Sequence, residues 1–103
     1  MLYMHDLMVS RAQIVQALSG CMDPELNANI IEIGLIYNII VHDNDVKLVL
    51  TMTSPMCPVT SIIMADAQLR METIQGIGKV ELELVWEPLW SPEMMSDDLK
   101  YRI

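Results

Sequence analysis

The chain has 103 residues, of which 52% are hydrophobic and 19% charged, and its formal net charge is −8. This length suits one domain over residues 1–103, and the hydrophobic fraction is too high for a disordered chain. Because 6 Lys and Arg stand against 14 Asp and Glu, we expect neither nucleic acid nor an anionic membrane surface as a partner.

The sequence also argues against a membrane span and a secretory signal. No apolar run reaches the roughly 18 residues that a membrane helix needs. Residues 1–8 lack the basic and long apolar regions of a signal peptide. Cys21 and Cys57 could pair, but one bridge is a weak reason to expect a secreted scaffold. We therefore predict a reduced protein in the cytoplasm.

The first predicted element is a helix over residues 10–19. Ser10 and Gln13 have the spacing of a capping box, and Val9 and Ile14 have that of a hydrophobic staple. A β-hairpin is predicted next. Its strands cover residues 35–42 and 46–53, and turn residues lie between them.

A second helix is predicted from Pro58 to about Ile74, because apolar residues recur there on one face. A third strand follows over residues 80–86, where apolar residues alternate with Glu81 and Glu83. The tail is predicted to be a loop with one helical turn after Ser96.

This order of elements, helix–strand–strand–helix–strand, predicts an α+β fold. The expected architecture is a two-layer sandwich in which two helices cover one face of a three-stranded sheet. We expect the first strand to lie between the other two, as in a split βαβ unit.

The segment Thr51-Met52-Thr53-Ser54-Pro55-Met56-Cys57-Pro58 has the highest density of candidate chemical groups. Pro58 suits the first position of the second helix, which would place Cys57 at or beside its N-cap. A helix N-terminus favours a thiolate, and a thiolate is both a metal ligand and a nucleophile. A free cysteine is also commonly a small buried residue. The spacing leaves both interpretations open, and the flanking prolines favour a functional one.

Other candidate residues have simpler interpretations. Cys21 lies on the apolar face of the first helix and is predicted to fill the core. His5 and His42 are isolated in the sequence and are predicted to be surface residues. One cysteine cannot complete a four-ligand zinc or iron–sulfur site. If Cys57 binds metal, the remaining ligands must come from a second subunit, a partner or a small thiol.

Two further pairs of residues have either a functional or a structural interpretation. Asp23 and Glu25 flank Pro24 and form either a functional acidic pair or a cap and a solvated acid, of which the second is favoured. Trp86 continues the inward face of the third strand and is predicted to be in the core. Trp90 lies beyond the break at Glu87-Pro88 and is expected to cover either the Cys57 turn or a partner groove.

Together, four segments resemble the iron–sulfur cluster assembly domain family, which includes SufT-like and PaaD-like proteins and the eukaryotic cytosolic targeting factors. The resemblance extends from Ile14 to Ser96. It is carried by Ala17-Leu18 through Asp23-Pro24-Glu25-Leu26, by Ile33-Gly34-Leu35-Ile36-Tyr37, by Thr51 through Pro58, and by Glu87-Pro88-Leu89-Trp90 with Met95-Ser96.

This resemblance implies a two-layer α+β fold and a non-enzymatic role in the assembly, maturation or delivery of iron–sulfur clusters. It assigns the metal, cluster or partner contact to Cys57, and it makes Asp23, Glu25, Thr53 and Trp90 supporting residues. The implied cargo is a transient iron–sulfur cluster or iron. The implied partners are the assembly machinery and apo client proteins, and a homodimer would bring two Cys57 thiolates together.

Two alternatives remain at this point. One is a PaaD-like adaptor subunit of a multicomponent oxygenase. The other is a small thiol enzyme with Cys57 as nucleophile, although neither histidine belongs to a motif that would supply its base.

Overall fold

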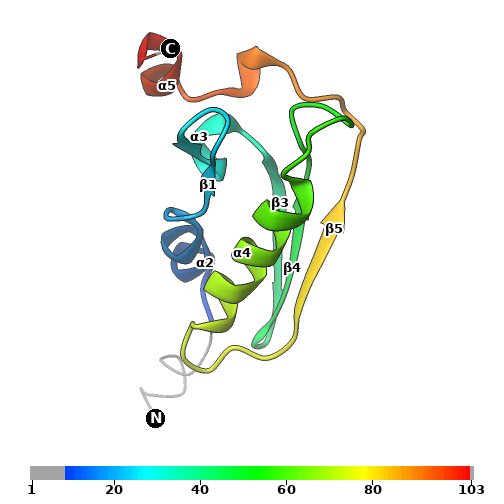
Figure 1. Cartoon of the computed structure of the whole chain (residues 1–103). Coiled ribbons are helices and arrows are strands. Elements are labelled where there is room, and N and C mark those ends of the chain that lie inside the picture. The colour runs from blue at the N-terminus through cyan, green and yellow to red at the C-terminus, as the bar shows by residue number, and fades with distance from the viewer. Residues whose placement is uncertain (1–8, 103) are drawn as a thin grey trace.

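The structure is a computed structural model that describes residues 9–102 (Figure 1). The interpretations given above for residues 1–8, including His5, therefore lie outside the described residues. A three-stranded sheet forms one layer, and helices α2 and α4 lie on one of its faces (Figure 1). The predicted two-layer α+β architecture is confirmed.

Helix α2 (Arg11–Leu18) begins as its sequence predicts. The Ser10 hydroxyl oxygen accepts a hydrogen bond from the Gln13 N–H at 3.2 Å, and the Gln13 side-chain oxygen accepts one from the Ser10 N–H at 2.9 Å. This reciprocal capping box satisfies two N–H groups that the helix itself cannot pair. Ile14 and Leu18 are both fully buried against the sheet layer.

In the chain, α2 is followed by a small hairpin that the sequence pattern did not predict. Strands β1 (Met22–Asp23) and β2 (Ala28–Asn29) pair in antiparallel fashion, and the short helix α3 (Ile30–Ile33) follows directly. Gly34 ends α3 with a φ of 86°, a left-handed conformation in which a side chain would be strained.

The main sheet contains β3 (Ile36–His42), β4 (Asp45–Leu50) and β5 (Val80–Leu84) in the order β3-β4-β5. Strands β3 and β4 form the predicted hairpin, and β4 pairs with β5 in parallel. The expectation that the first strand is central was wrong, because β4 occupies that place. Helix α4 (Thr60–Glu72) connects β4 to β5 in such a way that β5 lies on the side of β4 opposite β3. The N–H of Val85 donates to the carbonyl of Leu50 on that side.

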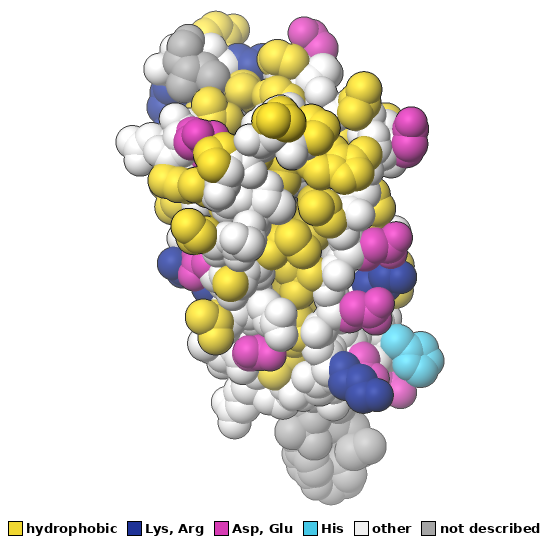
Figure 2. Space-filling view, turned by 45° about the vertical axis from the view of Figure 1, so that its right-hand side comes forward, with side chains coloured by type: hydrophobic (Ala, Val, Ile, Leu, Met, Phe, Trp, Pro, Cys, Tyr) yellow, Lys and Arg dark blue, Asp and Glu magenta, His cyan; other side chains and the backbone are white. Residues whose placement is uncertain are grey.

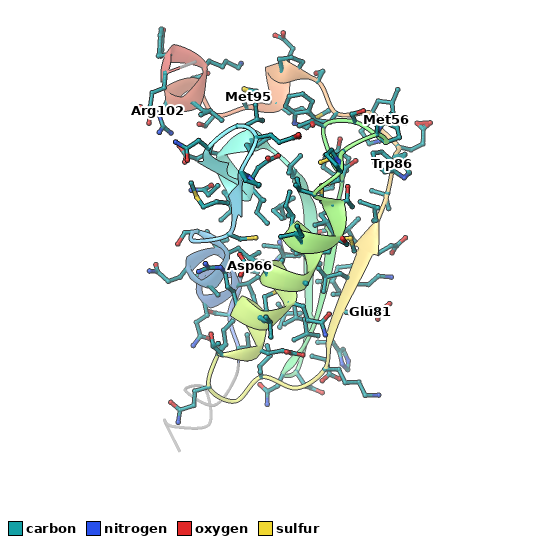
Figure 3. All side chains as sticks on the ribbon, in the orientation of Figure 1. Met56, Asp66, Glu81, Trp86, Met95 and Arg102 are labelled. Carbon is teal, nitrogen blue, oxygen red and sulfur yellow. The ribbon has the colours of Figure 1, made fainter. Side chains whose placement is uncertain are left out.

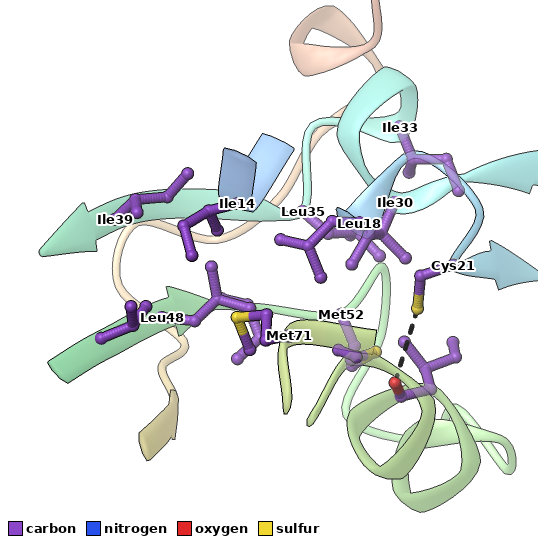
Figure 4. Close-up of a cluster of buried hydrophobic side chains, with 14 of the residues drawn as sticks. Ile14, Leu18, Cys21, Ile30, Ile33, Leu35, Ile39, Leu48, Met52 and Met71 are labelled. Atoms are coloured by element: carbon purple, nitrogen blue, oxygen red, sulfur yellow. Dashed lines mark hydrogen bonds between the residues drawn. The ribbon is translucent and has the colours of Figure 1, made fainter. Parts of the chain in front are cut away.

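The core lies between this sheet and the helices (Figure 4). Aliphatic and thioether side chains fill it, as expected from a chain with ten Met and no Phe. Its largest fully buried hydrophobic side chains are Ile14, Leu18, Ile30, Ile33, Leu35, Leu48, Leu50, Met52, Ile63, Met71 and Leu99.

After β5 the chain crosses one end of the molecule through the 3-10 helix η1 (Pro92–Met94) and helix α5 (Asp97–Arg102) (Figure 1). Helix α5 confirms the helical turn predicted after Ser96. The N–H of Ser96 donates to the carbonyl of Glu32 at 2.7 Å, which ties this segment to α3. Among residues 9–102, no helix combines the length and hydropathy needed to cross a membrane.

Candidate functional site

The turn that carries Cys57 joins the end of β4 to the start of α4. The N–H of Cys57 donates to the carbonyl of Ser54 at 3.1 Å, and the hydroxyl oxygen of Ser54 accepts from the N–H of Met56 at 3.1 Å. The Thr60 hydroxyl then donates to the carbonyl of Cys57 at 3.0 Å. Three hydrogen bonds thus fix the backbone on both sides of the cysteine.

Cys57 does not lie at the helix N-terminus. Helix α4 begins at Thr60 with Val59 as its N-cap, so both the start at Pro58 and the position of Cys57 at or beside the N-cap were wrongly predicted. The physical reason is the turn itself, because the bond from Cys57 to Ser54 closes it before the helical bonds begin. Cys57 therefore belongs to a hydrogen-bonded turn that precedes α4, and not to the first turn of the helix.

The Cys57 side chain is half-buried and lies beside a carboxylate. Its Sγ atom is 4.0 Å from Oε1 of Glu25, which comes from the turn between β1 and β2. The neighbouring Met56 side chain is 86% exposed. One thiol, one carboxylate and one exposed thioether-bearing side chain therefore meet solvent at this end of the molecule.

Asp23 supports this arrangement from below the surface. It is only 2% exposed, and its Oδ1 accepts a hydrogen bond from the N–H of Glu25 at 2.8 Å. Its own carbonyl accepts from the N–H of Asn27 at 2.8 Å. Asp23 is thus a turn residue and not the helix cap that was favoured, because a hairpin rather than a helix follows it. Through this turn it positions Glu25 next to Cys57.

Cys21 is in the core, as predicted. It is fully buried, and its thiol donates to the carbonyl of Ile63 at 3.6 Å (Figure 4). Burial, followed by the nearby carboxylate of Asp66, raises the pKa of Cys21 from 9.0 to about 12. Cys21 is therefore a neutral, inaccessible thiol at physiological pH.

The remaining predicted residues lie around the same end of the fold. Thr53 is half-buried in the segment that leads into the Cys57 turn. Trp86 was predicted to be a core residue of the third strand, but it lies beyond the end of β5 and is only half-buried against the core. It lies at the same end of the molecule as Met56 (Figure 3). The Trp90 indole N–H donates to the carbonyl of Ile33 at 2.8 Å, so this side chain fastens the C-terminal segment to α3.

The residues that hold this segment in place were not predicted from the sequence. The Tyr37 hydroxyl donates to the carbonyl of Pro88 at 2.8 Å and contacts Sδ of Met94 at 3.4 Å. A Cβ atom on Gly34 would collide with the backbone carbonyl of Met94. Gly34 and Tyr37 both belong to a segment that carried the family resemblance. That resemblance was the one sequence feature that pointed to these two residues.

The donor groups at the site set a limit on the metal chemistry. Across residues 9–102, no three His, Cys, Asp or Glu side chains gather into a potential metal site. The contact between Cys57 and Glu25 brings together one sulfur and one oxygen atom. An iron–sulfur cluster bound as cargo at Cys57 would therefore take its other ligands from a second chain or a small thiol.

The sequence model of the family described as iron–sulfur cluster assembly protein matches residues 11–84. The chain belongs to this family. The match includes Asp23, Glu25, Thr53 and Cys57, whereas Trp90 lies beyond it. The family assignment made from the sequence resemblance is thus confirmed.

Individual members of the family are similar over most of the chain. A Porphyromonas gingivalis protein named Fe-S protein maturation auxiliary factor is 34% identical over 91% of this chain and 90% of its own length. The Staphylococcus aureus Fe-S protein maturation auxiliary factor SufT is 37% identical over 73% of this chain and 86% of its length. The solved structure of a conserved hypothetical protein from Thermotoga maritima has a TM-score of 0.83 and 38% identity, with 92% and 94% of the chains covered.

Proposed function

We propose that this protein is an auxiliary factor in iron–sulfur protein maturation and that Cys57 is its contact with the cluster, iron or client. The role follows from its family and from the maturation-factor names of its relatives. In this proposal the protein acts in the cytoplasm without catalysing a reaction, and it works with the assembly machinery and apo client proteins.

One observation carries the assignment to Cys57. Of the two cysteines, Cys57 lies half-exposed on a fixed turn, whereas Cys21 is fully buried and bonded to a backbone carbonyl. Only a sulfur atom that solvent can reach is able to accept and release a cargo without unfolding. Incomplete ligation by one thiol suits transfer, because the cargo leaves when a client offers more ligands.

The Glu25 carboxylate is proposed to assist the Cys57 thiol. At 4.0 Å from Sγ, it can serve as an oxygen ligand to iron held on the sulfur. Two chains that meet near Cys57 would offer two thiolates and two carboxylates. This homodimer is part of the proposal, and its chemical motive is completion of a four-ligand set.

The test of the function uses cells in which the gene for this chain is deleted. The activity of an iron–sulfur enzyme, divided by the amount of that enzyme, is measured after the cells receive wild type, Cys57→Ala or Cys21→Ala. We expect wild type and Cys21→Ala to restore the activity and Cys57→Ala to leave it low. Equal activity with and without the wild-type gene would contradict the function, and full restoration by Cys57→Ala would contradict the role of the cysteine.

The two alternative functions receive less support. The maturation-factor names of the relatives favour general maturation over an oxygenase adaptor. A thiol enzyme would need a base near Cys57, a role that the Glu25 carboxylate could take, but the relatives are named as maturation factors and not as enzymes. His42 lies at the far end of strand β3, next to Asp43.

A further inference from the structure

Strand β5 forms an edge of the sheet, and no other strand within residues 9–102 pairs with its outer side (Figure 1). The carbonyl of Lys79 accepts from the N–H of Val46, and the N–H of Val85 donates to the carbonyl of Leu50, both at 2.8 Å. Alternate residues of a paired strand bond to the same neighbour. The backbone groups of Val80, Leu82 and Leu84 therefore face away from β4, toward the free edge.

The same three residues turn apolar side chains toward the helix layer without being fully covered. Val80, Leu82 and Leu84 are half-buried and pack at the margin of the core. Figure 2, which brings this side of the molecule forward, shows a band of hydrophobic side chains along its length. The free edge of β5 thus combines unpaired backbone groups with partly exposed apolar surface.

Helix α4 supplies the other margin of this apolar band. Asp66 and Arg70 lie on the flank of α4 that faces Cys21 and Gly20, whereas Ile63, Ala67 and Met71 face the core. At 100° per residue, Met64 falls on the opposite flank, toward β5. Met64 is half-buried at the margin of the core, like the residues of β5.

The opposite face of β5 carries two carboxylates. Glu81 and Glu83 are exposed and alternate with the apolar residues of the strand. Lys47 on β4 pairs with Glu83 at 2.9 Å and lies in register with Glu81, and the exposed Lys79 lies near Glu81 just before the strand. Within β5 itself, Glu81 and Glu83 are the charges beside the free edge. A strand that added to this edge would meet apolar surface on one face and negative charge on the other.

We propose that β5 is a docking edge for an extended segment of a partner protein, in which apolar residues alternate with Lys or Arg. The segment adds to the sheet as a fourth strand, a known mode of peptide recognition. Its apolar side chains cover Leu82, Leu84 and Met64, and its basic side chains lie beside Glu81 and Glu83. This proposal stands independently of the function assigned to Cys57.

Charge argues against a second copy of this chain as the occupant. Two β5 strands paired with each other would bring the Glu81 and Glu83 side chains of both copies together on one face. Like charges directly opposite each other destabilise a strand pair. The basic segment of a partner has the complementary pattern instead.

The other edge of the sheet is less suited to adding a strand. Helix α2 packs against β3, and Ile39 on the inner face of β3 is only 8% exposed. The pairing of β3 with β4 also shifts between Ile36 and Asn38. Such an irregularity bends a strand and hinders edge-to-edge pairing. The two edges therefore differ, and β5 is the open one.

The test uses the full chain and a short synthetic peptide of alternating Lys and Val, followed by NMR-detected amide hydrogen exchange. In the free protein, we expect the amides of Glu81, Glu83 and Val85 to be protected and those of Val80, Leu82 and Leu84 to exchange quickly. Addition of the peptide is expected to slow exchange at the second set. This alternating pattern is specific to an added strand.

Three matched controls accompany this test. The same peptide with N-methylated amides keeps its charges but cannot donate backbone hydrogen bonds, so we expect no protection. Glu81→Lys should weaken peptide binding by about fivefold, whereas Glu72→Lys, an equal charge change at an exposed position on α4, should leave it unchanged. Cys57→Ala should bind the peptide like wild type, which separates this test from the test of the proposed function.

Three results would overturn the proposal. The first is a peptide that shifts resonances without protecting Val80, Leu82 and Leu84. The second is equal binding by wild type and Glu81→Lys. The third is protection of these amides in the absence of peptide, if that protection increases with protein concentration. This result would mean that a second copy of the chain occupies the edge of β5.

Discussion

The two cysteines have opposite environments, and the difference is set by their immediate neighbours. Cys21 is surrounded by core side chains and bonded to the Ile63 carbonyl. Cys57 lies half-exposed on a turn that Ser54 and Thr60 hold in place. The same side chain therefore serves as core packing in one place and as a reachable thiol in the other.

The raised pKa of Cys21 predicts a pH dependence of stability. Its folded-state pKa of about 12 exceeds the ordinary value of 9.0, so the folded state keeps a proton that the unfolded state loses. The free energy of unfolding should therefore fall as pH rises from about 9 toward 12. Urea unfolding across this range measures the effect in wild type and in Cys21→Ala.

The comparison between these two proteins isolates the Cys21 contribution, because Tyr and Lys residues titrate in both. Wild type should lose more stability than Cys21→Ala over this pH range. Parallel loss of stability in the two proteins would show that Cys21 is not the buried thiol described here.

At the level of single residues, the sequence predicted only what local spacing determines. Helical periodicity predicted the core position of Cys21, which is correct, but the residue lies beyond the end of α2 and not on its apolar face. The contact between Cys57 and Glu25 could not be predicted, because it joins residues far apart in the chain. Their meeting depends on the β1–β2 hairpin, whose two-residue strands are too short to show alternation.

Among the elements, the C-terminal segment depends on α3 for its position. Trp90 bonds to Ile33, the N–H of Ser96 bonds to the carbonyl of Glu32, and the Arg102 side chain pairs with the Glu32 carboxylate. Leu99 of α5 is 2% exposed and belongs to the core. The segment is thus an integral part of the fold, although the family match ends at residue 84.

The bond from Trp90 to Ile33 predicts a measurable loss of stability. Trp90→Phe keeps an aromatic ring but leaves the Ile33 carbonyl without its indole partner, which should lower the free energy of unfolding by about 1–2 kcal/mol. Urea unfolding measures this change. Tyr101→Phe, at a side chain 90% exposed in α5, is the control and should change stability by less than about 0.5 kcal/mol. Equal effects of the two variants would contradict the role given to Trp90.

Element prediction succeeded where local signals agreed. The capping box placed the start of α2. Alternation found β4 and β5, but these strands end at Leu50 and Leu84 and not at residues 53 and 86 as predicted. The start of α4 was misplaced because Pro58 suits a first helical position as well as a turn. The strand order was wrong because it depends on where α4 returns the chain, and neither periodicity nor turn chemistry encodes that path.

On the scale of the whole molecule, the candidate site and the free edge of β5 adjoin. The bond from Val85 to Leu50 fixes the C-terminal end of β5 beside the residue that leads into the Cys57 turn. A segment docked along β5 would therefore extend toward Cys57. This arrangement would let one surface recognise a partner while a nearby thiol contacts the cargo.

Anaerobic reconstitution with iron and sulfide shows whether Cys57 is the thiol that receives iron–sulfur cargo. Visible charge-transfer absorption is recorded for wild type, Cys21→Ala and Cys57→Ala. We expect absorption in the first two proteins and its loss in Cys57→Ala. Absence of absorption in wild type, or equal absorption in Cys57→Ala, would contradict it.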